Sequence, residues 1–345
     1  MSKPKRITGP WRLADLAALE PNGLTGFSCF HCGGGSTMGY KLAGFQMLGG
    51  VEIDPQMMEM YRANHNPQHS YLMGVQDFNK IPRAKLPAEL KNLDLLDGSP
   101  PCSVFSMAGK REKKWGSEHH FREGQQKQRL DDLFMHFIEV AHRLQPKVVV
   151  AENVKGLILG NAKGYVKEIF GAFHAAGYDA QLFLFNAARM GVPQARERTF
   201  FIARRRSLGW APLKLAFSEP PVTLRQALAG TKGDGKPLGP KVSELWKHTA
   251  RGENFSKAAG GSWFTWNRLS WNRPSPSVVS RSPPSHPDEA RHLSHSETIR
   301  VQSFPDDYNF QARDANYVCG MSVPPFMTQR VALEIGRQWF GLDYA

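Results

Sequence analysis

The segment that decides the fold is residues 95–106, which read LLDGSPPCSVFS. The apolar run Leu93–Leu96 is short and stops at a glycine two residues later, as in a buried strand. Two prolines then fix the backbone, so Cys102 follows a stiff turn. In open α/β sheets, ligands bind outside the carboxyl ends of the strands. The segment therefore predicts a reactive thiol beside a binding crevice, the alternative being a small apolar residue in a turn.

Length and composition describe an ordinary globular chain with a strong positive charge. The 345 residues are 41% hydrophobic and 22% charged, and the formal net charge is +13. Such a charge predicts a polyanionic partner, nucleic acid first, against the alternative of a merely soluble basic surface. No apolar run reaches transmembrane length, no signal-peptide pattern is present, and four cysteines fit a reducing intracellular compartment.

Alternating apolar runs and amphipathic stretches predict an α/β fold, a doubly wound and mostly parallel sheet. The expected strands are 26–30, 47–53, 93–96, 148–151 and 178–185. The expected helices are one through Met38, Leu42 and Phe45 and others at 55–64, 133–144, 165–176 and 327–340. The chain then divides into a basic N-terminal segment (1–22), a main α/β part (23–206), a separate region (207–290) and a return to the main part (291–345).

A glycine-rich turn after the first expected strand points to a nucleoside cofactor. Residues 33–35 are all glycine, and such a turn leaves backbone N–H groups free near a helix N-terminus. Glu52 ends the next strand, where a carboxylate can bind both hydroxyls of a ribose. The spacing differs from the dinucleotide fingerprint, which disfavours a hydride carrier. Cys29 and Cys32 form a C-x-x-C pair that we interpret as structural, because no second pair supports zinc.

Polar groups also flank two later apolar runs. Glu152 ends the run 148–151, and a buried carboxylate is costly unless it has a partner or a chemical role. Arg196 and Arg198 alternate with period two ahead of another apolar run, so we expect them on one strand face, where they clamp a polar group. Ordinary surface arginines are the alternative.

Two polar stretches are candidates for contact with nucleic acid. Residues 103–126 predict a basic lid over the thiol, a solvated loop being the alternative. Residues 207–287 mix basic and aromatic side chains with turns, which is typical of a nucleic-acid surface, although a loose insertion has the same composition. The basic and aromatic residues concerned are Lys241, Lys247, Arg251, Trp263, Trp266, Arg268, Trp271 and Arg273.

Taken in order, these motifs resemble those of the C5-cytosine methyltransferases over about residues 25–340. The motifs are Phe30 with the glycine turn, Glu52, Pro101-Cys102, Glu152-Asn153-Val154, Gln194-x-Arg196-x-Arg198, residues 291–306 and Gly320 to Pro325. The resemblance implies a bacterial or phage-type DNA methyltransferase with the Rossmann-like, S-adenosylmethionine-dependent fold. It makes 23–206 and 291–345 the catalytic and cofactor-binding domain, and 207–290 a smaller inserted target-recognition domain.

The resemblance also assigns chemistry to single residues. Cys102 would add to carbon 6 of a flipped-out cytosine and so activate carbon 5 toward a methyl donor. Glu152 would hold and protonate ring nitrogen 3. Arg198 would bind the ring oxygen, with Arg196 and Gln194 shaping the site.

S-adenosylmethionine is the implied cofactor, S-adenosylhomocysteine the product, and no metal is implied. The expected contacts are Phe30 with the adenine side, Gly34 and Gly35 with the methionine moiety, Glu52 with the ribose and Ile53 with the adenine face. Val75, Ser99, Pro101, Ser322 and Val323 complete the predicted cofactor site. Three positions depart from the family pattern, namely Cys32, Gly74 where an aspartate is usual, and Met321. Asp77 is a candidate substitute for that aspartate.

The implied partner is double-stranded DNA, in the cytoplasm of a bacterium or a phage-infected host. The sequence leaves open whether a cognate restriction endonuclease exists. We expect no membrane association and no obligate protein partner. One alternative is a tRNA cytosine-5 methyltransferase, although its Cys-Phe-Thr tripeptide is missing from the sequence. A non-catalytic DNA-binding protein and a dithiol oxidoreductase using Cys29 and Cys32 are the others.

Overall fold

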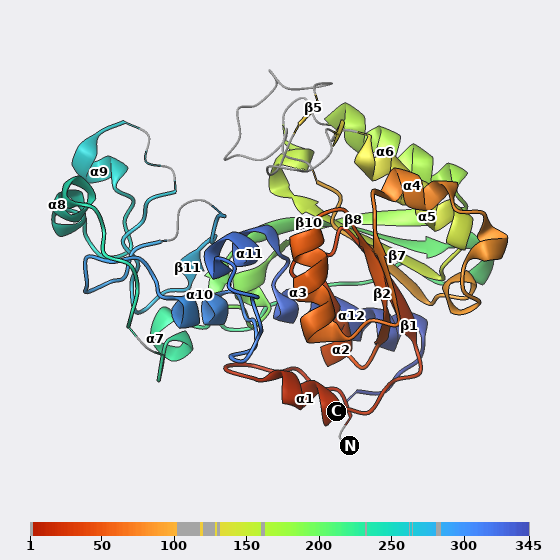
Figure 1. The fold of residues 1–345 in the computed structure, drawn as a ribbon, viewed down its shortest axis with the longest axis horizontal. Helices are drawn as coiled ribbons and strands as arrows, with labels where there is room; N and C mark the ends of the chain where they lie inside the picture. Colours follow the sequence, from red (N-terminus) through yellow and green to blue (C-terminus); the bar gives the residue numbers. More distant parts are fainter. Residues whose placement is uncertain are drawn as a thin grey trace.

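The computed structural model describes residues 3–101, 132–159, 163–231, 233–261, 263, 265–280 and 284–344, together with the short antiparallel pair β5 (Glu118–His119) and β6 (Gln128–Arg129). Its centre is a seven-stranded sheet in the order β3-β2-β1-β4-β7-β10-β8 (Figure 1). The strands are β1 (Thr25–Cys29), β2 (Gln46–Glu52), β3 (His69–Leu72), β4 (Leu95–Gly98), β7 (Val148–Val154), β8 (Tyr178–Asn186) and β10 (Glu197–Arg205). Strands β1 to β4 and β7 pair in parallel, and β10 pairs antiparallel with both β7 and β8. The predicted doubly wound, mostly parallel sheet is confirmed.

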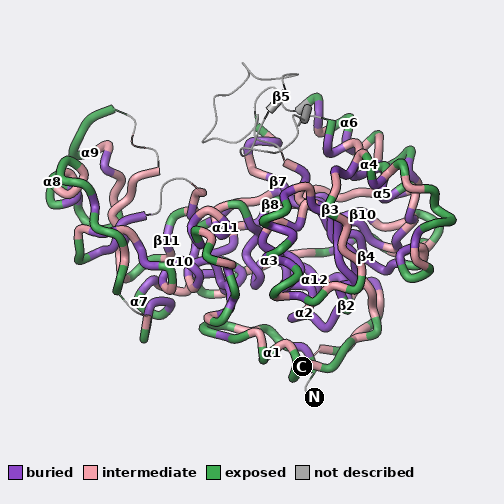
Figure 2. Tube along the Cα trace, in the orientation of Figure 1, coloured by how far each residue is buried: buried purple, intermediate pink, exposed green. Residues whose placement is uncertain are grey.

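Alternate residues of the central strands face two separate cores, because side chains along a strand point to opposite faces. Leu95, Val150 and Ile202 belong to one core and Leu96, Val149 and Phe201 to the other. Such strands are buried on both faces, which explains their continuous apolar sequence. In Figure 2 the sheet region is accordingly coloured as buried.

Helices cover both faces of the sheet. The first core includes side chains of α2 (Gly35–Leu42), α3 (Pro55–His65) and α12 (Pro325–Trp339). The second includes α4 (Val75–Lys80), α5 (Leu133–Leu144) and α6 (Lys163–Ala175). The short α1 (Leu13–Ala17) follows Trp11, which is buried and donates its indole N–H to the Ser303 carbonyl at 2.9 Å. The N-terminal segment is therefore packed onto the last third of the chain.

Two local expectations were wrong. Helix α2 ends at Leu42 rather than continuing through Phe45, because Gly44 adopts a φ of 85° and turns the chain into β2. Arg196 lies between β9 (Gln194–Ala195) and β10 and not on a shared strand face with Arg198. The strand is interrupted at Arg196 because β9 is not part of the main sheet and pairs in parallel with β11 (Ser275–Pro276).

Residues 207–290, here called the inserted region, have little regular structure. Its helices are the short α7 (Leu224–Ala227), α8 (Pro240–His248) and α9 (Ser256–Ala259). Two small apolar clusters support them, one around Leu224, Leu269 and Val278 and one around Trp246 and Phe255. In Figure 1 the part of this region that carries α7, α8 and α9 stands to one side of the sheet, with α10 (His295–Val301) and α11 (Ala315–Met321) between the two. Its first residues, among them Trp210, Leu213 and Phe217, instead pack against the first core of the sheet.

Candidate active site

A cavity of about 330 Å³ lies at the carboxyl ends of the parallel strands. One wall is formed by the ends of β1, β2, β4 and β7, and the other by residues 278–280 and the end of α11. Nine predicted site residues line it, namely Phe30, Glu52, Ile53, Val75, Ser99, Pro101, Glu152, Arg196 and Arg198. The expected base-binding and cofactor-binding groups therefore share one continuous space.

Glu152 and Arg198 form a buried ion pair on one side of this cavity. The Arg198 Nε lies 3.0 Å from the Glu152 Oε1, and the two side chains are 16% and 11% exposed. Neighbouring β7 and β10 place them, since their register pairs Phe200 with Glu152 and Arg198 with Val154. Burial lowers the pKa of the Arg198 guanidinium, and the Glu152 carboxylate opposes that shift. The pair places a carboxyl group and N–H donors side by side on the cavity wall, an arrangement that can bind a polar ring.

The turn that carries the predicted nucleophile is tied to the end of β7. Asn153 donates its side-chain amide to the Pro100 carbonyl at 3.1 Å, and its Oδ1 accepts the Val154 N–H at 2.8 Å. The described chain reaches the cavity at Pro101. Cys102 and the predicted lid, residues 103–126, lie outside the described residues. Sequence reasoning quoted Asn153 within a motif but gave this side chain no role.

Glu52 is held at the other end of the cavity by backbone N–H groups. Its carboxylate accepts hydrogen bonds from Cys32, Ile53 and Asp54 at 3.0, 2.9 and 3.0 Å. Burial raises its pKa, and the three N–H donors oppose that effect. Phe30 and Cys32 adopt positive φ values of 56° and 46°, a strained turn that places both in the cavity wall. The carboxylate is thus fixed and aimed before any ligand arrives.

Four other predicted cofactor residues lie behind this lining. A Cβ added to Gly35 would stand 2.1 Å from the Val323 carbonyl oxygen, so this glycine lets two segments touch. Gly34 has a φ of 72° and lies against the His65 ring. Ser322 and Val323 are buried beside the same turn. Gly35, Ser322 and Val323 thus pack the glycine turn against the segment that leads into α12, and Gly34 packs it against α3.

Gln194 and Arg196 bind backbone groups of the opposite cavity wall, and neither is a partner in the Glu152–Arg198 ion pair. Arg196 donates to the carbonyls of Val278 and Gly320 at 3.0 and 2.9 Å. Gln194 is fully buried, is not part of the cavity lining, and accepts the Val278 N–H at 3.0 Å. The wall residues Val278, Val279 and Ser280 carried no recognisable signal in the sequence, since they sit in a polar stretch without periodicity.

The C-x-x-C pair is divided between the two faces of the sheet. Cys29 is buried in the core on the α5 side, whereas Cys32 packs against the core on the α2 side. Burial raises the pKa of the Cys29 thiol, which makes it unreactive. Among the residues the structure describes, no group of three or more His, Cys, Asp or Glu could hold a metal ion. The structural interpretation of this pair is the one the geometry supports.

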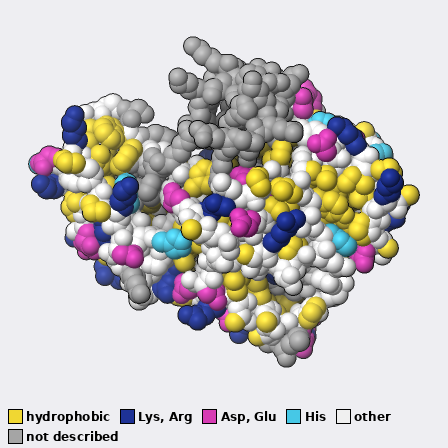
Figure 3. All heavy atoms as spheres, in the orientation of Figure 1, with side chains coloured by type: hydrophobic (Ala, Val, Ile, Leu, Met, Phe, Trp, Pro, Cys, Tyr) yellow, Lys and Arg dark blue, Asp and Glu magenta, His cyan; other side chains and the backbone are white. Residues whose placement is uncertain are grey.

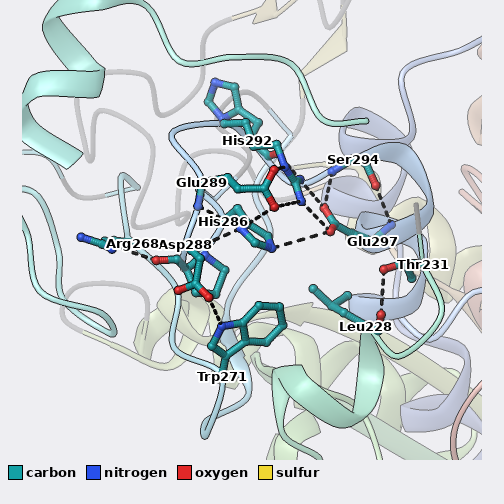
Figure 4. Close-up of polar contacts among 12 residues, drawn as sticks. Leu228, Thr231, Arg268, Trp271, His286, Asp288, Glu289, His292, Ser294 and Glu297 are labelled. Carbon is teal, nitrogen blue, oxygen red and sulfur yellow. Dashed lines mark hydrogen bonds and ion pairs between the residues drawn. The ribbon is translucent and has the colours of Figure 1, made fainter. Parts of the chain in front are cut away.

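Many of the basic and aromatic side chains of the inserted region bind one another. The Arg268 guanidinium lies 3.8 Å from the centre of the Trp246 ring and donates to the carbonyls of Pro287, Trp246 and Thr249. The Trp271 indole N–H donates to Asp288 at 2.8 Å (Figure 4). Trp263 and Trp266 pack around Phe255. Lys241 and Arg273 are exposed, and Figure 3 shows Lys and Arg side chains at the outer edge of this lobe.

No helix in the described part of the chain combines the length and apolar character that crossing a membrane would require.

The fold and the cavity define a class, the doubly wound α/β proteins with a binding cavity at the carboxyl ends of the strands. Comparison with known sequences then identifies the chain. The family model of the C-5 cytosine-specific DNA methylases matches residues 24–232 and 236–337. The chain belongs to this family, and it is a DNA cytosine methyltransferase.

Individual relatives agree with the family model. The chain is 30% identical to the type II methyltransferase M1.HphI of Haemophilus parahaemolyticus over 90% of its own length and 86% of that protein. It is 26% identical to the type II methyltransferase M.NgoPII of Neisseria gonorrhoeae over 89% and 94%. A solved structure described as a DNA modification methyltransferase encoded within a prophage of E. coli has the same fold. Its TM-score is 0.71, with 21% identity over 92% of this chain and 99% of that one.

Proposed function

We propose that this protein transfers a methyl group from S-adenosylmethionine to carbon 5 of a flipped-out cytosine in duplex DNA, through a covalent adduct on Cys102. The observation that carries the proposal is the single cavity that holds the Glu152–Arg198 pair and the Glu52 carboxylate. A base at one end and a cofactor at the other would meet inside it, at the turn that ends in Pro101.

The residues present fit S-adenosylmethionine. The Glu52 carboxylate is a suitable acceptor for the two ribose hydroxyls, and its three backbone donors leave further lone pairs free. Phe30, Ile53 and Val75 supply apolar surface for a flat adenine ring. When bound, this cofactor supplies an electrophilic methyl group on a sulfonium.

The proposed chemistry begins at the base. The Cys102 thiolate adds to carbon 6 of cytosine, and electron density moves to carbon 5. Glu152 protonates ring nitrogen 3 and so prevents negative charge from building up on the ring. Arg198 keeps Glu152 in place and donates N–H groups to the ring oxygen. Carbon 5 would then take the methyl group, with S-adenosylhomocysteine as the leaving product. A base removes the proton from carbon 5, the sulfur–carbon bond breaks, the thiolate returns, and nitrogen 3 gives its proton back to Glu152.

Burial of the ion pair supports this division of roles. A buried pair of opposite charges is costly to desolvate and is retained where its geometry serves a purpose. Its position on adjacent strands fixes both groups without help from a loop. A cytosine could reach them only outside the helical stack, since a base inside a duplex is covered on both faces.

The biological setting is proposed from the relatives. Several of them are named as type II methyltransferases and one, from Bacillus phage SPR, as an orphan methyltransferase. We therefore propose action on DNA in the cytoplasm of a bacterium or phage-infected cell, with or without a cognate endonuclease. The inserted region would read the target sequence.

Bisulfite sequencing of plasmid DNA from cells that express the protein tests the proposal. We expect protected cytosines in one short sequence context, and none with the Cys102→Ser variant, because serine is a far weaker nucleophile toward carbon 6. The variant must retain the thermal melting temperature of the wild type. Wild-type protection by Cys102→Ser would remove the covalent step, and the absence of any protected DNA cytosine would favour RNA as the substrate.

A further inference from the structure

The cavity wall on the side of the inserted region lies outside the main sheet. Val278, Val279 and Ser280, which follow β11, form part of it, and Gly320 and Met321 at the end of α11 form the adjoining part. Because neither segment belongs to the main sheet, no ladder of main-chain hydrogen bonds joins the two. The side chains that bind both segments therefore decide how they lie relative to each other.

Two buried glutamines form a relay behind the wall. The Gln194 Oε1 accepts the Val278 N–H at 3.0 Å, and its amide nitrogen donates to the Gln302 Oε1 at 2.6 Å. Gln302 in turn donates to the Ser322 carbonyl at 2.8 Å. Both glutamine side chains are 0% exposed. One continuous row of hydrogen bonds thus runs from Val278 to Ser322.

Further contacts lock the same two segments together. Arg196 bridges the carbonyls of Val278 and Gly320, and the Asn316 amide donates to the Val279 carbonyl at 3.0 Å. A Cβ on Gly320 would lie 2.4 Å from the Ser280 nitrogen, so the two backbones are in direct contact. A shift of residues 278–280 must therefore move residues 320–322 as well.

The energetics argue that the relay serves position rather than stability. A buried amide loses its hydrogen bonds to water, so the new bonds that it forms add only a small net stabilisation. What the amides add is direction, since each bond fixes one backbone group at one distance.

Helix α10 joins this relay to the inserted region. Gln302 is its C-terminal cap, and Glu297 lies near its other end. The Glu297 carboxylate binds the Arg291 guanidinium at 2.7 and 3.0 Å and caps the helix through the Ser294 N–H. Figure 4 shows Glu297 facing His286, whose Nδ1 accepts the N–H groups of Asp288 and Glu289. The last loop of the inserted region is thus bound to one end of α10 and the cavity wall to the other.

We propose that Gln302 is a positioning residue that couples DNA held by the inserted region to the cofactor end of the cavity. The coupling runs through two paths that meet at Gln302, one along residues 275–280 and Gln194, the other along α10. A displacement of the inserted region would be transmitted to Ser322, whose carbonyl binds Gln302 and whose side chain lies beside the glycine turn at Gly33 and Gly35. This inference rests on the proposed function, since it takes DNA and S-adenosylmethionine as the two ligands.

The test measures the affinity for S-adenosylhomocysteine by calorimetry, with and without a duplex that carries the bisulfite-mapped site. We expect this DNA to tighten wild-type binding by about 5-fold or more, in the usual range for coupled sites. In Gln302→Met the enhancement should fall below about 2-fold, while the affinity without DNA stays within about 3-fold. Turnover should fall with little change in the KM for DNA, because Gln302 contacts neither ligand.

Two further variants make the test specific. Gln338→Met is the matched control, because Gln338 also bridges a backbone N–H and a carbonyl, those of Lys214, but far from the cavity. It should behave as the wild type. Gln194→Met breaks the relay one residue earlier and should lose the same enhancement. Combined with Gln302→Met it should add little, as expected for two members of one path.

The outcomes separate the inference from the proposed function. A folded Gln302→Met or Gln194→Met protein that keeps the wild-type enhancement overturns the inference, as does a wild type that methylates DNA but shows no enhancement. If Gln302→Met melts before it can be measured, the result for Gln194→Met decides. A wild type that binds no S-adenosylhomocysteine and methylates no DNA would instead overturn the proposed function.

Discussion

The main sheet and the inserted region use the same residue types for opposite purposes. In the sheet, main-chain ladders hold the strands, so Glu152, Arg198 and Glu52 are free to project into the cavity. In the inserted region short helices and isolated bridges leave the backbone without such support. There Arg268 and Trp271 hold the chain itself. Where main-chain hydrogen bonds fix the backbone, side chains are available to bind ligands. Where such bonds are few, the side chains are needed to fix the backbone.

The comparison is tested most strongly at Glu152. Glu152→Gln keeps the shape of the side chain but cannot supply a proton as a carboxylic acid does, and we expect methylation to slow by about 10²- to 10⁴-fold. Affinity for S-adenosylhomocysteine should stay within about 2-fold, because the sheet still holds the cofactor end. Single-turnover kinetics and calorimetry provide the two measurements.

Glu197→Gln is the matched control for that change. Glu197 pairs with Lys155 at 2.8 Å and its side chain is 42% exposed, so the same substitution nearby should leave the rate almost unchanged. A Glu152→Gln rate within about 10-fold of wild type would contradict a role in proton transfer.

The inserted region is tested next, at Arg268. Arg268→Met removes the guanidinium from the Trp246 ring and from three carbonyls, and we expect a loss of about 3 kcal/mol of local stability. DNA binding should weaken more than 10-fold because the region loosens, whereas S-adenosylhomocysteine affinity should not change. Fluorescence anisotropy with duplex DNA and hydrogen exchange of residues 240–290 are the measurements.

Arg273→Met separates structure from charge. Arg273 is exposed, so its substitution removes one positive charge without loosening the region. It should lower the slope of log affinity against log salt concentration by about the value expected for one phosphate contact, with no change in hydrogen exchange. If both variants weakened DNA binding equally without any change in exchange, Arg268 would be a contact residue and the comparison would fail.

The smallest expected effect concerns buried histidines in the main domain. Burial lowers the pKa of His31 from 6.5 to about 3, and it lowers the pKa of His65 as well. The unfolded chain takes up protons below about pH 6.5 while folded His31 stays neutral, so stability is full above that pH and is lost as the pH falls. For His31 the loss at pH 5 is on the order of 2 kcal/mol.

Urea unfolding at pH 7.5 and pH 5 measures that loss. His31→Phe should unfold with a smaller difference between the two pH values than the wild type, by up to about 2 kcal/mol, because one proton-binding group is gone from the unfolded state. His174→Phe, at an exposed position of α6, should leave the difference unchanged. Asp97 has its pKa raised by burial to about 6 and acts in the opposite sense, but equally in all three proteins. Equal pH dependence in wild type and His31→Phe would show that His31 titrates as if exposed.

The sequence predicted the fold well where local pattern and burial agree. The strands around Leu95 and Val148 were found because each is a short, mostly apolar run bounded by turn residues. Glu52 and Glu152 were singled out because a polar group that ends such a run lies at the edge where ligands bind. Arg198 instead precedes its apolar run, and it reaches the same edge because β10 runs antiparallel to β7. The role of the candidate substitute Asp77 stays a prediction, since Asp77 is not part of the cavity lining and its carboxylate pairs with Lys80 at 2.8 Å.

The sequence by itself therefore determined the doubly wound sheet, the family and the polar groups at the strand ends. These follow from periodicity and from motifs that each lie within a few residues. Only the tertiary structure decided that Arg196 and Gln194 hold the cavity wall, that Cys29 and Cys32 face opposite cores, and that the tryptophans of the inserted region pack inward. The contacts of Arg196 and Gln194 depend on segments 80 or more residues apart meeting in space, such as Gln194 and Val278 or Gln194 and Gln302, and no local pattern records which distant backbone group a buried side chain will bind.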